Sequence, residues 1–294
     1  MQIPTRLPCR LFSLLARQAP VGLILRRGPS AWVQLNLWHT DTDVIESGQW
    51  LHGKLFVRRC DLSPDGSLFI YFASKYGRSQ FDTWTAISKP PYFTALALWP
   101  KGDSWGGGGL FIDRKTVWLN HHTANPHKDH VPPRWLKVLP NTEGYGEDYP
   151  IYSKHLLRDE WTVLQDGKWP RSTHMPVRAL QPTIFQKHHP DGEHMLLMKY
   201  TGYDPKRYGS PHEYEFFLQD TRYRTETMLE GATWADLDQR HRLVFTKNDG
   251  CLYVAEVKRS EFNPDLIADF NGHQPGEVLT PDWAKTWEKQ AGKG

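Results

Sequence analysis

The chain has 294 residues, of which 39% are hydrophobic and 23% are charged, a composition typical of a globular protein and not of a disordered one. Its 36 basic and 33 acidic residues nearly balance, which argues against a nucleic-acid-binding protein. No apolar run approaches the ~20 residues of a membrane span, so we expect no membrane association. The cysteines Cys9, Cys60 and Cys251 are widely separated and form no zinc-binding spacing, which favours a reducing compartment and predicts a cytoplasmic protein.

The N-terminal residues 1–40 contain several arginines but no Asp, Glu or Lys. We expect residues 1–20 to form a solvated basic arm rather than a phosphate- or membrane-binding one, followed by one domain over 21–294. Residues 10–18 are the best helix candidate near this end. At the other end, the cap-like Thr280 and the following Pro281 predict a short closing helix over 280–290.

Strand signals dominate the rest of the chain, as short aromatic and apolar runs bounded by Gly, Pro, Asn or Asp. The expected strand segments are 31–39, 54–60, 67–74, 82–88, 92–100, 109–120, 160–167, 194–200, 214–220, 242–257 and 265–271. Within 242–257, Asp249-Gly250 separates two apolar runs, which predicts a tight hairpin. The chain is therefore expected to be all-β with short terminal helices.

Pro-Asp-Gly precedes an apolar run twice, at 64–66 and at 190–192. Proline presets φ for a turn, the aspartate side chain caps it, and glycine takes a positive φ at its exit. Asp65 and Asp191 are separated by three times a period of about 42 residues, the length of a propeller blade. Gly107 and the region of Asp148 lie one and two periods after Asp65, and a degenerate turn follows at Asp238.

The stretches "LSPDGSLFIYF", "KHHPDGEHMLLM" and "WADLDQRHRLVF" resemble the strand turns of β-propellers of the TolB-like and WD type, although the recurring Trp-Asp and Gly-His signatures of WD repeats are missing. This resemblance implies a β-propeller with five blades, or six if the N-terminal segment and the C-terminal strand share one. An irregular β-sandwich or barrel is the alternative. The stretches "RRGPS-W", "RCDLSPDG" and "PPYFTALALWP" are similar to an uncharacterised bacterial protein family, and that similarity implies no activity.

A histidine-rich segment, 120–130, contains ligand types suited to a divalent metal. The candidate ligands are His121, His122, His127, Asp129 and His130. Their spacing matches no established zinc pattern, so a polar surface loop is the competing interpretation. His188, His189 and His194 flank the second Pro-Asp-Gly turn and have the same two interpretations.

Basic and aromatic residues alternate in the segment 199–217, which we expect to be an extended recognition loop. The candidate ligand-binding residues are Tyr203, Lys206, Arg207, Tyr208 and, next to a run of glycines, Trp105. Tyrosines that pack with their hydroxyls toward solvent are the alternative. The glycine run is no phosphate loop, because Leu110-Phe111 follow it where Lys and Ser/Thr are needed, and a tightly packed turn is expected instead.

No nucleophile elbow or Cys/His nucleophile signature is present, so the sequence does not decide whether the protein is an enzyme. The leading hypothesis is a non-enzymatic binding or scaffold module that requires no cofactor and recognises a protein or small ligand through one propeller face. The alternative is a hydrolase in the central funnel, assisted by a metal at the histidine-rich segment or based on paired carboxylates. Candidate carboxylates are Asp43, Asp103, Asp148, Glu213 and Asp236.

Overall fold

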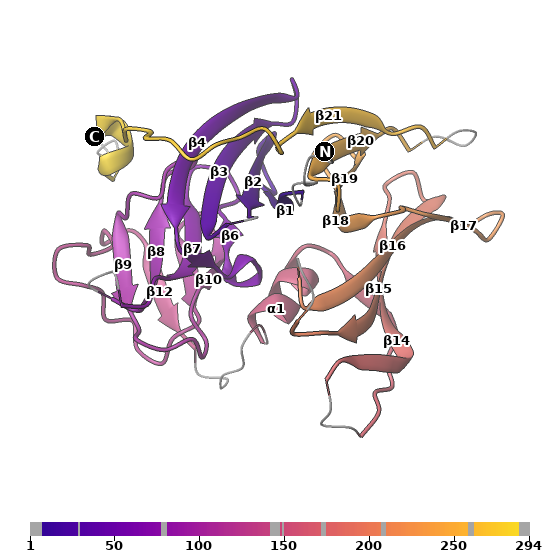
Figure 1. The fold of residues 1–294 in the computed structure, drawn as a ribbon, viewed down its shortest axis with the longest axis horizontal. Coiled ribbons are helices and arrows are strands. Elements are labelled where there is room, and N and C mark those ends of the chain that lie inside the picture. The colour runs from indigo at the N-terminus through magenta and orange to yellow at the C-terminus, as the bar shows by residue number, and fades with distance from the viewer. Residues whose placement is uncertain are drawn as a thin grey trace, which may run out of the picture. The chain divides into compact units, whose positions relative to one another are not determined.

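The computed structural model describes residues 8–28, 30–77, 81–141, 148, 150–171, 175–206, 210–257 and 262–287. Strands form five sheets (Figure 1). The fold is a five-bladed β-propeller, which confirms the prediction from the sequence repeat. The chain divides into two compact units, Ser13–His155 with His273–Gly294, and Met1–Phe12 with Leu156–Gly272. The expected division into a basic arm and a single domain stays a prediction. Among the described residues, no helix is long and apolar enough to cross a membrane.

The unit that begins at Ser13 contains sheets A, B and C, except for the first three residues of β1. Sheet A has the order β1-β2-β3-β4 and consists of β1 (Arg10–Leu15), β2 (Val21–Arg27), β3 (Trp32–His39) and β4 (Val44–His52). Sheet B has the order β5-β7-β8-β9, with β6 also paired to β7; its elements are β5 (Lys54–Leu55), the 3-10 turn η1 (Val57–Arg59), β6 (Asp61–Leu62), β7 (Phe69–Ser74), β8 (Thr83–Ser88) and β9 (Ala97–Pro100). Sheet C consists of β10 (Gly109–Asp113), β11 (Thr116–Leu119) and β12 (Lys137–Pro140), with β12 parallel to β11.

Strand β7 is paired on both sides within sheet B, and every residue of it is buried. A strand that is buried on both faces needs a continuous apolar run rather than an alternating one, and "FIYFAS" supplies it. Residues of sheets B and C pack together into one core, which comprises Leu68, Ile70, Ile87, Leu96, Ala97, Trp99, Phe111, Val117, Leu119 and Leu136. Burial of these side chains stabilises the unit by about 1.5–3 kcal/mol for each large one.

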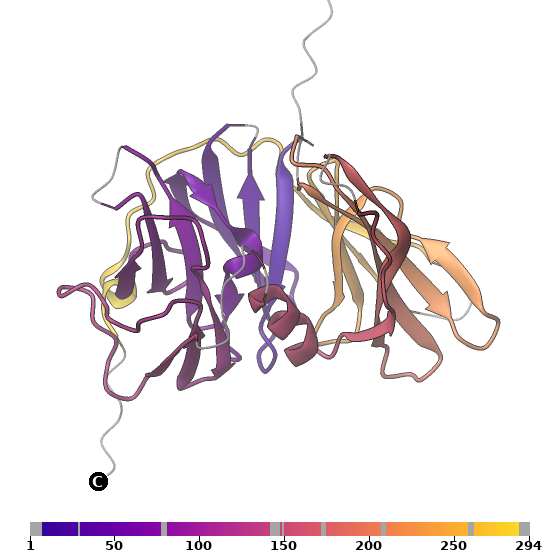
Figure 2. The same cartoon turned by 90° about the horizontal axis from the view of Figure 1, so that it is seen from below.

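The C-terminal segment, 273–287, runs over sheets A and B in a mostly extended conformation (Figures 1 and 2). Gln49 on β4 fixes it, because its Nε2 donates to the Val278 carbonyl at 2.9 Å and to the Thr280 hydroxyl at 2.6 Å. The segment ends in the 3-10 turn η2 (Asp282–Lys285), where the Trp283 carbonyl accepts a hydrogen bond from Lys89 at 2.9 Å.

The unit that contains Leu156–Gly272 consists of sheets D and F. Sheet D has the order β13-β14-β15-β16-β17 and comprises β13 (Thr162–Gln165), β14 (Val177–His188), β15 (His194–Tyr203), β16 (His212–Asp220) and β17 (Thr225–Met228). Sheet F has the order β18-β19-β20-β21 and comprises β18 (Ala232–Leu237), β19 (Leu243–Lys247), β20 (Cys251–Ala255) and β21 (Asp265–Asp269). The helix α1 (Ile151–Arg158) spans the boundary between the two units.

The aspartate turns occupy the same place in three sheets. Asp65 precedes β7, Asp191 precedes β15 and Asp238 precedes β19, and each of these strands is paired on both sides. Each aspartate accepts hydrogen bonds from backbone N–H groups of its own turn: Ser67 in the first, Glu193 and His194 in the second, Arg240 and Arg242 in the third. The repeat predicted from the sequence is thus confirmed at these three positions.

Other predicted elements are wrong. Residues 10–15 form the strand β1 instead of a helix, because Leu11 and Ser13 alternate into the interior beside β2. The region after Asp148, expected to begin another blade, forms the helix α1. The C-terminal helix is restricted to the four residues of η2, since the Thr280 hydroxyl binds Gln49 and Thr94 instead of capping a longer helix.

Candidate functional site

The predicted recognition residue Tyr203 lies at the end of β15, opposite His212 on β16, with ring centroids 5.1 Å apart. Tyr200 continues this aromatic surface, since it stacks on Tyr214 at 4.9 Å and contacts Trp169 at 4.8 Å. These cross-strand contacts hold the rings half-buried in one place. The segment is therefore largely sheet rather than a free loop, with strands β15 and β16 extending to 203 and from 212.

Of the other predicted ligand-binding residues, the structure describes Lys206 and Trp105, and both are exposed. Lys206 lies in an exposed turn, where its backbone N–H donates to Asp204 at 2.9 Å. Arg207 and Tyr208 lie outside the described residues. Trp105 belongs to the other compact unit and is 61% exposed, in a turn where Asp103 accepts a hydrogen bond from its backbone N–H at 2.8 Å.

The histidine-rich segment does not bring its imidazoles into one cluster. His121 is buried, and its Nε2 lies 2.7 Å from the Thr85 hydroxyl, whereas His122 is exposed. His127 and His130 lie with ring centroids 5.9 Å apart, and Asp129 lies 3.8 Å from His127 Nδ1. Among the described residues, three potential metal ligands come together elsewhere, at His189, Asp191 and His194.

Burial of His121 has a consequence for stability. Burial lowers the pKa of this imidazole to about 3 from an ordinary value of 6.5, and the nearby positive charge of Lys101 contributes further. The folded protein therefore keeps His121 neutral while the unfolded chain takes up a proton below pH 6.5, so stability falls as the pH decreases from 6.5 toward 3. We expect a loss of about 2 kcal/mol between neutral pH and pH 5 from this group.

Chemical denaturation of the wild type and of His121→Gln at several pH values measures this effect. The glutamine amide can still bind Thr85 but does not titrate, so stability of the variant should fall less steeply between pH 7 and pH 5. Parallel pH profiles for the two proteins would contradict the assignment.

The glycine run beside Trp105 is a tightly packed turn, as the sequence predicts. Gly108 has φ +82°, and a Cβ at this position would lie 1.9 Å from the Arg59 carbonyl oxygen. Arg59 is 2% exposed; its guanidinium donates to the carbonyls of Ser104 and Gly106 at 2.6 and 2.5 Å and to the Asp148 carboxylate at 2.9 Å. One buried arginine therefore organises this turn, which makes the run a structural element.

The candidate carboxylates are all bound to donor side chains in their own unit. Asp43 accepts from Trp38 Nε1 at 3.1 Å, Asp103 accepts from Lys101 at 2.7 Å, and Glu213 forms an ion pair with Arg178. Asp148 binds Arg59, and Asp236 binds Lys187 at 2.6 Å. Burial raises the pKa of Asp236 despite the attraction of Lys187. Four of the five carboxylates thus form structural ion pairs, and Asp43 forms a structural hydrogen bond.

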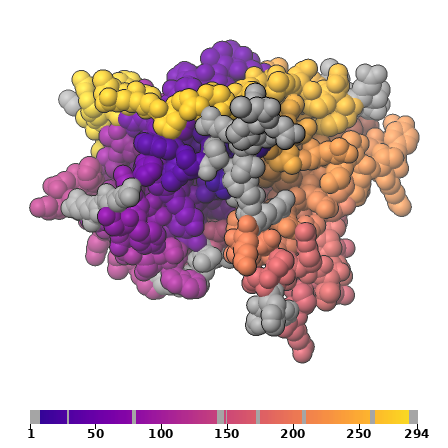
Figure 3. Space-filling model, in the orientation of Figure 1, coloured from indigo at the N-terminus to yellow at the C-terminus, as the bar shows by residue number. Residues whose placement is uncertain are grey.

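A groove between sheet A and the C-terminal segment was not anticipated from the sequence. It has a volume of about 450 Å³, in the range of small-ligand sites. Its lining residues are Trp32, Gln49, Trp50, Pro275, Gly276, Glu277 and Val278. Figure 3 shows the yellow C-terminal segment lying on the indigo and purple surface that holds these strands.

The two tryptophans of the groove are held in fixed positions. Trp32 and Trp50 are both half-buried and meet edge to face with ring centroids 6.5 Å apart. The buried Arg26 lies over the Trp50 ring at 5.2 Å and donates to the His273 carbonyl at 3.2 Å. Arg26 thereby supports both walls, and the groove combines apolar ring surface with the polar groups of Gln49 and Glu277.

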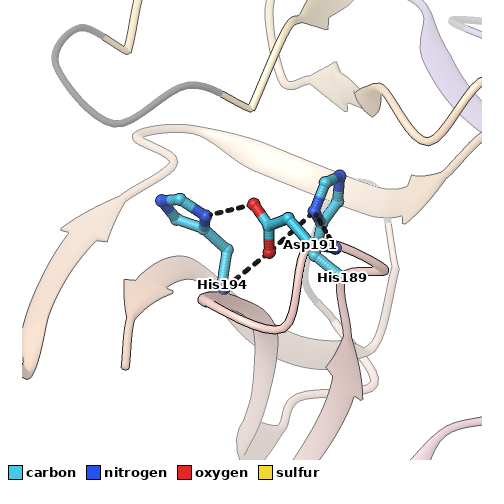
Figure 4. A group of neighbouring side chains, drawn as sticks. All are labelled: His189, Asp191 and His194. Carbon is cyan, nitrogen blue, oxygen red and sulfur yellow. Dashed lines mark hydrogen bonds and ion pairs between the residues drawn. The ribbon is translucent and has the colours of Figure 1, made fainter. Parts of the chain in front are cut away.

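The second Pro-Asp-Gly turn brings together the cluster that could hold a metal ion (Figure 4). Potential ligand atoms of His189, Asp191 and His194 all lie within 4.8 Å of one another. Asp191 Oδ1 lies 3.0 Å from His189 Nδ1, and Oδ2 lies 2.6 Å from His194 Nδ1. The two imidazoles are largely buried, with side chains 10% and 5% exposed. Partial burial would raise the pKa of Asp191, but hydrogen bonds from the Glu193 N–H and from His194 outweigh it and hold that pKa well below its usual range.

Neither a scan against protein-family models nor a search of curated proteins gives a match for this chain. Its class is therefore defined by its fold, which is that of a five-bladed β-propeller.

Proposed function

We propose that this protein is a non-enzymatic binding or scaffold propeller that recognises a protein or small ligand through aromatic side chains. The observation that carries the proposal is the groove of Trp32 and Trp50. Rigid, half-exposed tryptophans in a concave site supply large apolar contact area at little conformational cost, and the neighbouring amide and carboxylate groups orient a ligand. A flat ring, from a small molecule or from a peptide side chain, fits this chemistry.

Substitution of Trp50 tests the groove. A library of small cyclic and aromatic fragments, screened by ligand-observed NMR, should yield binders to the wild type whose affinity falls about tenfold or more in Trp50→Ala, because the stacking surface is lost. Tyr223→Ala is the control, since Tyr223 is an exposed aromatic residue that does not line the groove. Thermal melting checks that both variants are folded. Unchanged binding in a folded Trp50→Ala protein would reject the groove.

A second binding surface is proposed at Tyr203, Lys206, Arg207 and Tyr208, together with Trp105 as a separate contact. The aromatic contacts of Tyr203 and Tyr200 across β15 and β16 support it. The same fragment screen should include Tyr203→Ala. If this variant alone lost binding, the ligand-binding site would lie on sheet D and not in the groove.

The hydrolase alternative rests on the histidine-rich segment, His121 to His130, or on paired carboxylates, and we rank it second because each candidate carboxylate is bound to a donor. No cofactor is required by the binding proposal.

The kinship with TolB-like or WD-type propellers of bacteria, and a cytoplasmic location, are part of the same proposal. The shared aspartate turns support the kinship, and three buried cysteines outside any disulfide support the reducing compartment.

A further inference from the structure

The turn between β14 and β15 places two histidines opposite each other. The His189 backbone N–H donates to the His194 carbonyl at 2.9 Å, so the two residues form the last cross-strand pair before the turn. Gly192 takes φ +72° and closes the turn, and the Asp191 side chain folds back between the two imidazoles. Both imidazoles direct Nδ1 toward the same carboxylate, as Figure 4 shows.

The outer nitrogen of each imidazole faces an acceptor. His189 Nε2 lies 2.8 Å from the His241 carbonyl oxygen, which can only accept, so Nε2 carries the proton. In the neutral ring, His189 Nδ1 is then a lone pair that faces Asp191 Oδ1 at 3.0 Å. His194 Nε2 faces the Asp220 carboxylate at 3.9 Å. Metal-binding histidines typically have this arrangement, in which a carbonyl or carboxylate orients the ring through the nitrogen that does not bind the metal.

The equivalent turns show what distinguishes this one. Asp65 is neutralised by Arg114 at 2.7 Å, and Asp238 by Arg242 at 2.8 Å. At Asp191 the neighbouring positive group is replaced by two imidazoles, which are metal ligands when neutral, whereas guanidinium groups are not. The same structural position is thus occupied by a fixed cation in two turns and by a ligand set in the third.

We propose that His189 Nδ1, Asp191 and His194 Nδ1 bind one Zn²⁺ ion. Nitrogen and oxygen ligands at 2.0–2.2 Å from a tetrahedral zinc lie roughly 3–4 Å from one another. The two Asp191–imidazole distances of 3.0 and 2.6 Å need to change only slightly to meet this range, and no two ligand atoms of the cluster are more than 4.8 Å apart. The ion would replace the 3.2 Å hydrogen bond from the Asp191 N–H to His189 Nδ1, and water would complete its coordination. This site is independent of the aromatic groove.

The ion would act as a structural staple of the β14–β15 hairpin. It would link both ends of the turn and neutralise Asp191, the role that Arg114 and Arg242 have in the other turns. Because His189 also binds the carbonyl in the β18–β19 turn, the staple would extend to sheet F within the same compact unit. A ligand that binds only the folded state stabilises it by RT ln(1 + L/Kd), where L is the free ligand concentration, so stability keeps rising as the ligand concentration increases.

Zinc binding to the full-length chain, stripped of metal with a chelator, tests the proposal. Calorimetry with Zn²⁺ alone should give one ion per chain with micromolar or tighter affinity, and the melting temperature should rise with zinc concentration. His189→Gln removes one ligand and should weaken binding by about tenfold or more. Co²⁺ bound to the wild type should show the intense visible absorption of a tetrahedral site and be displaced by Zn²⁺, a readout that requires no variant.

Two control variants separate this site from other histidines. His188→Ala changes the exposed neighbour of the cluster, and His127→Ala changes the histidine-rich segment; both should bind zinc as the wild type does. A wild type that binds no zinc would overturn the proposal and leave the turn a purely hydrogen-bonded one. Unchanged affinity in His189→Gln, or loss of binding in His127→Ala, would overturn it equally.

Discussion

Replacing Arg59 by alanine is expected to lower the free energy of unfolding by about 3–5 kcal/mol, because it removes one partner of a buried ion pair. The guanidinium is 2% exposed, and its loss would strand the carbonyls of Ser104 and Gly106 together with the Asp148 carboxylate. Each buried acceptor left unsatisfied costs about 1–3 kcal/mol. Denaturation in urea, followed by tryptophan fluorescence, measures the change.

The neighbouring Arg58 provides the control. It is also largely buried, but its guanidinium is 3.9 Å from Asp148 and lies over the Tyr152 ring at 5.0 Å, so Arg58→Ala should cost about 1 kcal/mol. Arg59→Lys keeps the charge but loses the planar fork that reaches three acceptors, and we expect a stability between those of the wild type and the alanine variant. Equal losses for Arg58→Ala and Arg59→Ala would contradict the special role of Arg59.

Among the described glycines of the unit that begins at Ser13, Gly108 is the one whose replacement by alanine should lower the free energy of unfolding most. The new Cβ would lie 1.9 Å from the Arg59 carbonyl oxygen and 2.7 Å from the Arg59 Cβ, so backbone must move. The left-handed φ of +82° adds about 1–2 kcal/mol of strain, and we expect a total loss of about 3 kcal/mol or more.

Gly102→Ala separates the two contributions. Gly102 has a similar φ of +92°, but a Cβ there meets nothing within 4 Å, so only the backbone strain applies. The variant should lose about 1 kcal/mol, measured by the same urea denaturation. If both alanine variants lost the same stability, crowding against Arg59 would carry no energy and the packed turn would be more tolerant than its distances indicate.

Local patterns predicted much of the fold. Turn chemistry identified Asp65, Asp191 and Asp238, and the apolar runs that follow them are the interior strands β7, β15 and β19. Strands without such patterns were missed. Strand β14 contains Pro182 and many polar residues, and its pairing with β15 is interrupted between Arg178 and Thr183. Such a strand is held by its neighbours more than by its own propensity, so its sequence carries little signal.

The candidate sites were harder to predict, because they depend on contacts between distant residues. The groove exists only because Gln49 meets Val278 and Arg26 meets His273, and no local pattern encodes those pairs. The histidine-rich segment was prominent by composition, but proximity along the chain did not bring its imidazoles together, since His121 turned into the interior. His189 and His194 were visible as flanks of a turn, but the carbonyl of His241 that orients one ring comes from another hairpin.

The C-terminal segment contributes one wall of the groove, and Gln49 and Arg26 attach it to the sheet that forms the other wall. A molecule that contacted both walls would hold the C-terminal segment against sheet A. Binding of this molecule and docking of the segment would therefore be thermodynamically linked. A change that favours detachment of the C-terminal segment would lower the affinity of the groove for this molecule. The bound molecule would oppose detachment by the same factor. The tail of this propeller is therefore a natural place from which its affinity could be tuned.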